Sequence, residues 1–265
     1  MRSLLLIMTG AAACVLPGPA QPQAVQFRAP IKIILVGDST TAVQTGWGGA
    51  FCGQHVTQYV SCVDMGRGGR STKTYRNEGH WALALNEAGT NGYAARYVLI
   101  EMGHNDKSTN PAIGTDLQAE FPANLVQMIR EVRDRGAIPV LVTPLARRYF
   151  ANGKLSDSLT PWADAVRQVA SQTNSPVIDL NSKSAQLFAQ MGPVKSLEFE
   201  NRAPTAAERA AAAKGTTLPA RVGDSKAGNQ ADYIHLNEAG AGQVSSLVAK
   251  LLGERVPALQ SYVFP

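Results

Sequence analysis

Five short runs along the chain are predominantly apolar and rich in β-branched residues. Runs of this length without alternating polar residues predict strands that are buried on both faces, which is typical of a parallel sheet covered by helices. The expected strands are residues 31–36 (IKIILV), 59–65 (YVSCVDM), 97–102 (YVLIEM), 138–143 (IPVLVT) and 176–180 (PVIDL). The chain is therefore predicted to be an α/β protein.

Stretches with apolar residues at helical spacing lie between the expected strands. Residues 116–135 have this spacing, with Asp116 as a candidate cap and Gly136 after the end. Residues 161–173 begin with proline, which is favoured in a first turn, and residues 237–253 form a third such stretch. The alternation of strands and helices predicts a three-layer α/β/α sandwich around a five-stranded parallel sheet with right-handed crossovers.

One segment, residues 193–230, does not follow this alternation. It is polar and rich in alanine, lysine and glycine. Its part 204–215 (PTAAERAAAAKG) predicts a helix on propensity alone, and the rest is expected to be a long surface loop. The chain shows no internal repeat and no linker, so residues 21–265 are predicted to form a single domain.

The first twenty residues have the features of an export signal. Arg2 precedes an apolar stretch from Leu4 to Leu16, and the small residues that follow suit cleavage after Ala20. The stretch is shorter than the roughly 20 apolar residues that a membrane span needs. Residues 1–20 are therefore predicted to be a signal peptide and the protein to be secreted or periplasmic, with lipid attachment at Cys14 as the alternative.

The overall charge narrows the choice of partners. The formal net charge is +5 and the sequence pI is about 9.2. This balance indicates either ordinary solubility or attraction to an acidic partner, such as an anionic polysaccharide. No basic block with interleaved aromatic residues occurs, so nucleic-acid binding is not expected.

The cysteines leave two alternatives open. Removal of the leader would leave Cys52 and Cys62, and export favours a disulfide between them, whereas two buried thiols are the alternative. The sequence contains no CxxC, no HExxH and no cluster of histidines and cysteines. Neither a metal nor an organic cofactor is therefore expected.

Residues 35–41 (LVGDSTT) follow the first expected strand and contain the first candidate for chemistry. In open α/β sheets, ligands bind beyond the carboxyl ends of the strands. Ser39 at a helix entry or tight turn is either a cap that accepts a backbone N–H or a nucleophile beside free N–H groups. The stretch is not a GxSxG elbow, because Thr41 holds the place of the second glycine. Taken alone, it favours the cap.

Two further segments follow the second and third strands. Residues 66–74 (GRGGRSTKT) are either a flexible turn or a place where Gly69 offers its N–H to an oxyanion. In residues 101–107 (EMGHNDK), Asn105 could place an amide in the same cleft. His104 and Asp106 are expected to brace the loop, with a titrating role as the alternative.

Residues 232–237 (DYIHLN) precede the last helix and supply an acid and a base three residues apart. Asp232 and His235 can lie on the same side of one turn. A carboxylate that orients an imidazole is what a serine nucleophile requires, because the imidazole takes the hydroxyl proton and the acid fixes its tautomer. The alternative for His235 is a structural histidine with satisfied hydrogen bonds.

Taken together, the four segments resemble the blocks of the SGNH (GDSL-type) hydrolases. The matching positions are Ser39, Gly69, Asn105 and His235, with Asp232 as the acid three residues before the histidine. GGRSTKTYRNEGHW, GHND and VTPLARRYF resemble the rhamnogalacturonan acetylesterase-like branch in particular. One departure is Asp64, at a position where that branch leads us to expect asparagine.

The resemblance implies a flavodoxin-like fold and a serine esterase that removes O-acetyl groups from a plant cell-wall polysaccharide, such as pectin or rhamnogalacturonan. It implies an oxyanion hole of the Ser39 and Gly69 N–H groups and the Asn105 side chain. Other acyl esterases of the family, such as lipases, thioesterases and xylan acetylesterases, share this catalytic set and remain alternatives. A non-catalytic carbohydrate-binding module is the alternative from another class.

Four further residues are candidate contacts to the polysaccharide. Trp47 and Trp81 lie in or near the first two blocks and could pack on sugar rings, with core packing as the alternative. Arg147 and Arg148 follow the fourth expected strand and could meet uronate carboxylates, with an ordinary surface role as the alternative.

Overall fold

The structure, a computed structural model, describes residues 28–218 and 232–265. The predicted signal peptide lies outside the described residues. Five parallel strands form one sheet in the order β2-β1-β3-β4-β7. They are β1 (Ile31–Gly37), β2 (Val60–Asp64), β3 (Arg96–Glu101), β4 (Ile138–Val142) and β7 (Val177–Ile178). The prediction of five parallel strands is confirmed.

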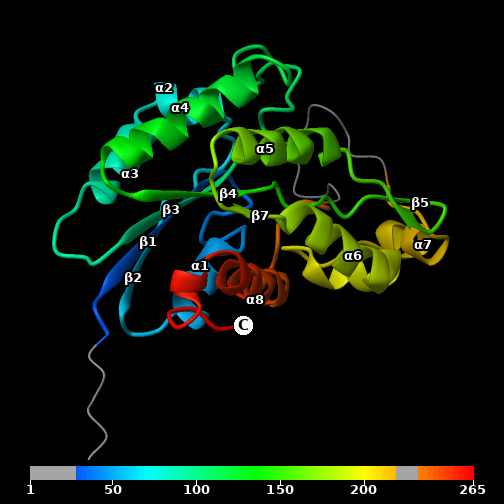
Figure 1. Cartoon of the computed structure of the whole chain (residues 1–265). Helices are drawn as coiled ribbons and strands as arrows, with labels where there is room; N and C mark the ends of the chain where they lie inside the picture. Colours follow the sequence, from blue (N-terminus) through cyan, green and yellow to red (C-terminus); the bar gives the residue numbers. More distant parts are fainter. Residues whose placement is uncertain (1–27, 219–231) are drawn as a thin grey trace, which may run out of the picture.

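Helices cover both faces of this sheet (Figure 1). One face carries α2 (Thr72–Asn77), α3 (His80–Ala88), α4 (Glu120–Asp134) and α5 (Thr160–Gln172). The other carries α1 (Gly48–Gln54), α6 (Leu180–Ser196) and α8 (Glu238–Arg255), with α7 (Ala206–Ala213) beside α6. The predicted three-layer α/β/α sandwich is confirmed.

The central strand β1 shows why both faces need a cover. All seven of its residues are buried. Ile33 and Leu35 belong to the core on the α1–α8 side, whereas Ile34 and Val36 belong to the core on the α3–α4 side. Successive side chains of a strand point to opposite faces, so a strand that is buried on both faces requires two cores.

The predicted helices are present with shifted ends. Residues 116–119 form a turn before α4, because the Asp116 carboxylate accepts the N–H groups of Gln118 and Ala119 at 2.9 and 2.7 Å. The helix α5 has proline in its first turn, as expected. Asn237 caps α8 by accepting the N–H of Gly240.

The segment 193–230 departs from the expected long loop. The helix α6 continues into it as far as Ser196, with a break at Gly192, where φ is +70°. A 3₁₀ turn, η1 (Leu197–Phe199), follows, and both Leu197 and Phe199 are buried. The helix predicted at 204–215 is present as α7, and residues 219–230 lie outside the described residues. Apolar residues at 197 and 199, rather than the average polarity, decide the structure here.

A small hairpin, β5 (Phe150–Ala151) with β6 (Lys154–Leu155), was not predicted from the sequence. Its turn is Asn152-Gly153, with φ of +50° and +75°. Asn-Gly is the strongest short-range signal for a two-residue hairpin turn, so the sequence did contain the signal.

Cys52 of α1 and Cys62 of β2 form a disulfide, which settles the alternatives left by the sequence. The bond closes a short loop, since the two residues are 10 apart. It joins the first helix to an edge strand of the sheet.

Replacing both cysteines with alanine is expected to lower the free energy of unfolding by about 2.5–3 kcal/mol, the chain-entropy value for a loop of this length. Urea unfolding of the oxidised wild type and the double variant measures the difference. The wild type treated with a reductant should resemble the variant. Equal free energies of unfolding for all three would contradict the prediction.

Membrane spans and metal-binding clusters are both absent from the described part of the chain. Across residues 28–218 and 232–265, no helix is long and apolar enough to cross a membrane. Within the same ranges, no group of three or more histidine, cysteine, aspartate or glutamate side chains is arranged to hold a metal ion.

Candidate active site

The candidate site lies where β1, β2 and β3 end. The turn containing Ser39 follows β1, the loop containing Gly69 follows β2, and Asn105 follows β3. Because the three strands are parallel neighbours, their carboxyl ends share one edge of the sheet.

Ser39 lies in a tight turn rather than at the start of a helix. The N–H of Ala42 binds the Asp38 carbonyl at 3.1 Å, and the Asp38 carboxylate accepts the Thr40 N–H at 2.9 Å. The capping role therefore falls to Asp38. The turn needs glycine at position 37, because a Cβ there would lie 2.1 Å from the Thr41 Oγ1 atom.

Ser39, His235 and Asp232 form a hydrogen-bonded chain. The Ser39 Oγ atom lies 2.8 Å from the His235 Nε2 atom, and the His235 Nδ1 atom lies 2.8 Å from the Asp232 Oδ2 atom. In the tautomer that suits both contacts, Nδ1–H donates to the carboxylate and Nε2 accepts the serine proton. A hydroxyl, an imidazole and a carboxylate in this order form a nucleophile, a base and an orienting acid.

A short link holds the histidine segment against the serine turn. The N–H of Leu236 donates to the Thr45 carbonyl at 2.9 Å. The Thr45 hydroxyl in turn donates to the Ser39 carbonyl at 2.6 Å. Residues almost two hundred positions apart are thus connected beside the triad by two hydrogen bonds that the sequence did not reveal.

The acid of the triad is held in its charged form. Burial raises the pKa of Asp232, but the hydrogen bond and charge of His235, together with the backbone N–H groups of His235 and Ile234, outweigh it and the pKa is lowered. The carboxylate is therefore ionised at neutral pH and can stabilise an imidazolium.

Asn105 is half-buried, with its side-chain amide fixed on two acceptors. The Nδ2 atom donates to the Asp38 Oδ2 atom at 3.2 Å and to the Arg70 carbonyl at 3.2 Å. From the loop after β2, Gly68 approaches Ser39 so closely that a Cβ on this glycine would lie 3.6 Å from the serine Cβ. Gly69 follows with φ of +78°, which glycine adopts without strain.

A buried acid pair lies beneath the site. Burial and the charge of Glu101 raise the pKa of Asp38 to about 7, against the bonds from Thr40. Burial likewise raises the pKa of Glu101, although it accepts four hydrogen bonds. Its donors are the Thr40 and Thr41 hydroxyls, the Trp47 indole N–H and the Leu145 backbone N–H. Glu101 thus ties the serine turn to the ends of β3 and β4, a role that sequence reasoning missed.

His104 and Asp106 brace the loop around Asn105, as expected. The His104 Nε2 atom lies 2.8 Å from the Leu145 carbonyl, and burial lowers the pKa of His104 well below its usual value, so the ring is neutral. Asp106 is buried and accepts the hydroxyl and N–H of Thr72 at 2.6 and 3.0 Å.

Asp64 stands where the resemblance led us to expect asparagine. Its carboxylate accepts the Gly66 N–H at 2.8 Å. Burial raises the pKa of Asp64 to about 6, against this bond. The oxygen of an asparagine could accept the same N–H, so either residue supports the loop that carries Gly69.

Three of the four candidate sugar contacts are corrected by the structure. Trp47 has no exposed surface and donates to Glu101, and Trp81 is 4% exposed and donates to Glu131. Arg148 is fully buried. None of these three side chains is available to a polysaccharide. Arg147 keeps part of its surface exposed and donates to the His104 carbonyl at 3.3 Å, beside Asn105.

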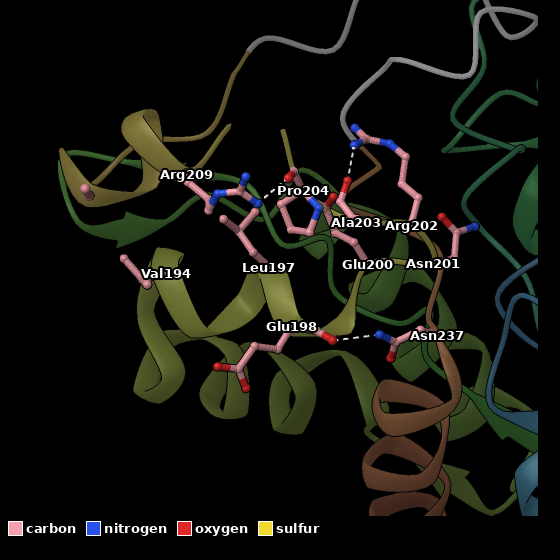
Figure 2. A pocket seen from close by; sticks show the side chains of 11 residues that line it. Val194, Leu197, Glu198, Glu200, Asn201, Arg202, Ala203, Pro204, Arg209 and Asn237 are labelled. Carbon is pink, nitrogen blue, oxygen red and sulfur yellow. Dashed lines mark hydrogen bonds between the residues drawn. The ribbon is translucent and has the colours of Figure 1, made fainter. Parts of the chain in front are cut away.

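A cavity of about 610 Å³ lies between α6, η1 and α7, and Figure 2 shows the side chains that line it. The cavity reaches Asn237, which is two residues after His235. The side-chain amide of Asn237 donates to the Glu198 carbonyl at 2.7 Å. None of the three triad residues lines it. The cavity is therefore separate from the proposed reacting groups.

Comparison with known proteins identifies the family of this chain. The sequence model described as the GDSL-like Lipase/Acylhydrolase family matches residues 35–242. YesY of Bacillus subtilis (strain 168), described as a probable rhamnogalacturonan acetylesterase, is 30% identical over 229 residues, which cover 84% of this chain and 92% of YesY. RhgT, a rhamnogalacturonan acetylesterase of the same strain, is 35% identical over 178 residues, which cover 64% of this chain and 73% of RhgT.

Solved structures show the same fold. The Bacillus subtilis protein YxiM matches with a TM-score of 0.64 and 25% identity over 85% of this chain and 56% of that protein, so this chain spans about half of its length. A catalytic mutant of Axe2, an acetylxylan esterase from Geobacillus stearothermophilus, matches with a TM-score of 0.54 and 16% identity over 84% of this chain and 94% of that chain. The family match and the identity to YesY show that this chain belongs to the GDSL-like lipase/acylhydrolase family and is a carboxylic ester hydrolase.

Proposed function

We propose that this protein is a serine esterase that removes O-acetyl groups from a plant cell-wall polysaccharide through an acetyl intermediate on Ser39. The observation that carries the proposal is the position of His235, whose two ring nitrogens lie 2.8 Å from the Ser39 hydroxyl and 2.8 Å from the Asp232 carboxylate. Nucleophile, base and orienting acid are thus already aligned.

The first step forms the acetyl-enzyme. The His235 Nε2 atom takes the hydroxyl proton as the Ser39 Oγ atom attacks the acetyl carbonyl carbon, and a tetrahedral oxyanion results. The C–O bond to the sugar then breaks, and the sugar oxygen leaves with the proton from His235. Asp232 stabilises the imidazolium while the proton is held.

The second step returns the enzyme to its starting state. His235 takes a proton from water, and the resulting oxygen attacks the carbonyl of the acetyl-serine. The bond to the Ser39 Oγ atom breaks, the serine regains its proton, and acetate leaves.

The oxyanion of both steps is assigned to three donors: the Ser39 and Gly69 N–H groups and the Asn105 Nδ2 atom. The contact of Gly68 with Ser39 supports this assignment. The two N–H groups of Asn105 donate to Asp38 and to the Arg70 carbonyl at 3.2 Å each, so one of them exchanges its acceptor for the oxyanion when the substrate reacts. Backbone N–H groups that are held before the reaction stabilise developing charge without reorganisation.

Replacing Asp38 with asparagine is expected to lower kcat by about 10–100-fold, the cost of losing a hydrogen bond to a charged group. The oxygen of the new asparagine could still accept the Thr40 N–H. Its NH₂ group would then face the NH₂ group of Asn105, and both are donors. The amide of Asn105 would lose its carboxylate acceptor and turn away. Ester hydrolysis by the variant, normalised to the folded fraction from circular dichroism, measures the effect, and an unchanged kcat would contradict it.

The choice of an acetylated pectic polysaccharide rests on three observations. YesY and RhgT bear the name rhamnogalacturonan acetylesterase. The chain is basic, with a formal net charge of +5, which favours an acidic polymer. Arg147 offers partly exposed positive charge beside Asn105, where a uronate carboxylate could bind.

Acetate release tests the substrate. Acetylated rhamnogalacturonan should be a better substrate than acetylated xylan, and p-nitrophenyl acetate better than p-nitrophenyl esters of longer acyl chains. Preference for xylan would favour a xylan acetylesterase, and preference for long chains would favour a lipase or thioesterase.

Export remains part of the proposal. The apolar leader and the small residues before position 21 support cleavage after Ala20. Sequencing of the exported protein should begin at Gln21. An intact amino terminus, or lipid on Cys14, would contradict it.

A further inference from the structure

Arg148 lies on the chain between β4 and the hairpin β5–β6 and is completely buried. A buried guanidinium needs partners for its charge and for its N–H groups. Its two terminal nitrogens, Nη1 and Nη2, donate to carbonyl oxygens of the segment that carries the catalytic acid and base.

Arg148 donates hydrogen bonds to the carbonyls of four consecutive residues, 232–235. The Nη2 atom donates to the Asp232 and His235 carbonyls at 3.2 and 2.8 Å, and Nη1 donates to the Ile234 carbonyl at 3.3 Å. The backbone N–H of Arg148 donates to the remaining carbonyl, that of Tyr233, at 2.8 Å.

The segment 232–235 has no helix or strand to satisfy these groups itself. Its N–H groups at 234 and 235 are taken by the Asp232 carboxylate, and its carbonyls are taken by Arg148. Tyr233 is buried and the other three residues are half-buried, and backbone polar groups that are removed from water require partners. The conformation that carries His235 towards Ser39 therefore depends on this arginine.

We propose that Arg148 is a positioning residue that fixes the segment from Asp232 to His235 at hydrogen-bonding distance from Ser39. The proposal rests on the proposed function. The planar guanidinium presents donors in a fork that reaches several carbonyls at once, whereas a lysine ammonium is a single point on a flexible stem.

The positive charge of Arg148 also stabilises the position of the segment, because it attracts the Asp232 carboxylate. Burial lowers the pKa of Arg148 to about 10, against the charges of Asp232 and Glu200, so the side chain stays protonated at neutral pH. The guanidinium carbon also lies 5.8 Å from the centre of the Phe188 ring, which helps to hold its orientation.

The test compares wild type, Arg148→Met and Arg148→Lys in p-nitrophenyl acetate hydrolysis. We expect Arg148→Met to lower kcat by about 10²-fold, the effect of a misplacement of about 1 Å, with KM changed by less than about threefold. Arg148→Lys should fall between the two. All rates are normalised to the folded fraction from circular dichroism. If Arg148→Met folds poorly, the comparison of Arg148→Lys with wild type decides the test.

Arg96 provides a matched control at the opposite end of the sheet. It begins β3 and donates to three backbone carbonyls, those of Ala88, Arg135 and Gly136, at 2.6, 3.2 and 3.2 Å. Arg96→Met should lower thermal stability and leave kcat unchanged, because no catalytic group lies there. An equal loss of kcat in Arg96→Met and Arg148→Met would show a general effect on stability and overturn the proposal.

A spectroscopic readout separates positioning from stability. The proton on the His235 Nδ1 atom, held by Asp232, should give a downfield proton resonance in wild type that shifts upfield or broadens in Arg148→Met. Wild-type kcat and an unchanged resonance in both Arg148 variants would overturn the proposal. An inactive wild type would instead overturn the esterase function itself, so the two failures are distinguishable.

Discussion

Replacing Ser39 with alanine is expected to lower kcat for ester hydrolysis by about 10⁵–10⁶-fold, because a triad without its nucleophile has no covalent route. The fold should persist, since Asp38 rather than Ser39 caps the turn. Release of p-nitrophenol from p-nitrophenyl acetate measures the rate, and thermal unfolding by circular dichroism measures the stability.

Ser61→Ala is the matched control for this loss. Ser61 lies within β2, away from the carboxyl edge of the sheet, and its hydroxyl accepts a bond from Tyr93 at 3.0 Å. Its removal should leave kcat at the wild-type value. Full activity of Ser39→Ala, or equal losses in both variants, would contradict the role of Ser39.

Replacing Asn105 with alanine is expected to lower kcat by about 10²–10³-fold, the usual effect of removing one oxyanion donor. The loss should fall on kcat rather than on KM, because the amide acts on charge that develops only in the transition state. Steady-state kinetics with p-nitrophenyl acetate separates the two constants.

Asn86→Ala, on the exposed surface of α3, is the corresponding control and should keep wild-type kinetics. A wild-type kcat in Asn105→Ala would show that backbone N–H groups alone hold the oxyanion. A rise in KM with unchanged kcat would instead place Asn105 in ground-state binding.

The fold was predictable where a single local pattern decides the structure. The strand at 31–37 is apolar at every position except Lys32 and the final glycine, and the sheet is built around it. The short helices α1 and α2 were not predicted, because six or seven residues carry too little periodicity. Residues 193–199 were mispredicted as loop because the average polarity of the segment concealed buried apolar residues such as Leu197, whereas the helix expected at 204–215 is present as α7.

The candidate site was predictable as a set of residues but not as a set of contacts. Asp232 and His235 stand three residues apart, and this spacing already suggested their pairing in the sequence. By contrast, Trp47 lies close to Ser39 in sequence and Arg148 follows β4, yet both side chains point into the interior. Position beside a motif does not reveal the direction of a side chain, and only the packed sheet shows that Glu101 joins three strand ends.

Covalent labelling with an organophosphate tests the central claim most directly, because such reagents react with an activated serine. Intact-mass spectrometry of the treated protein, with peptide mapping, should show one adduct, on Ser39, formed in proportion to the loss of esterase activity and absent from Ser39→Ala. Complete inactivation with the adduct on another residue, or an active enzyme whose Ser39 is fully modified, would contradict the account.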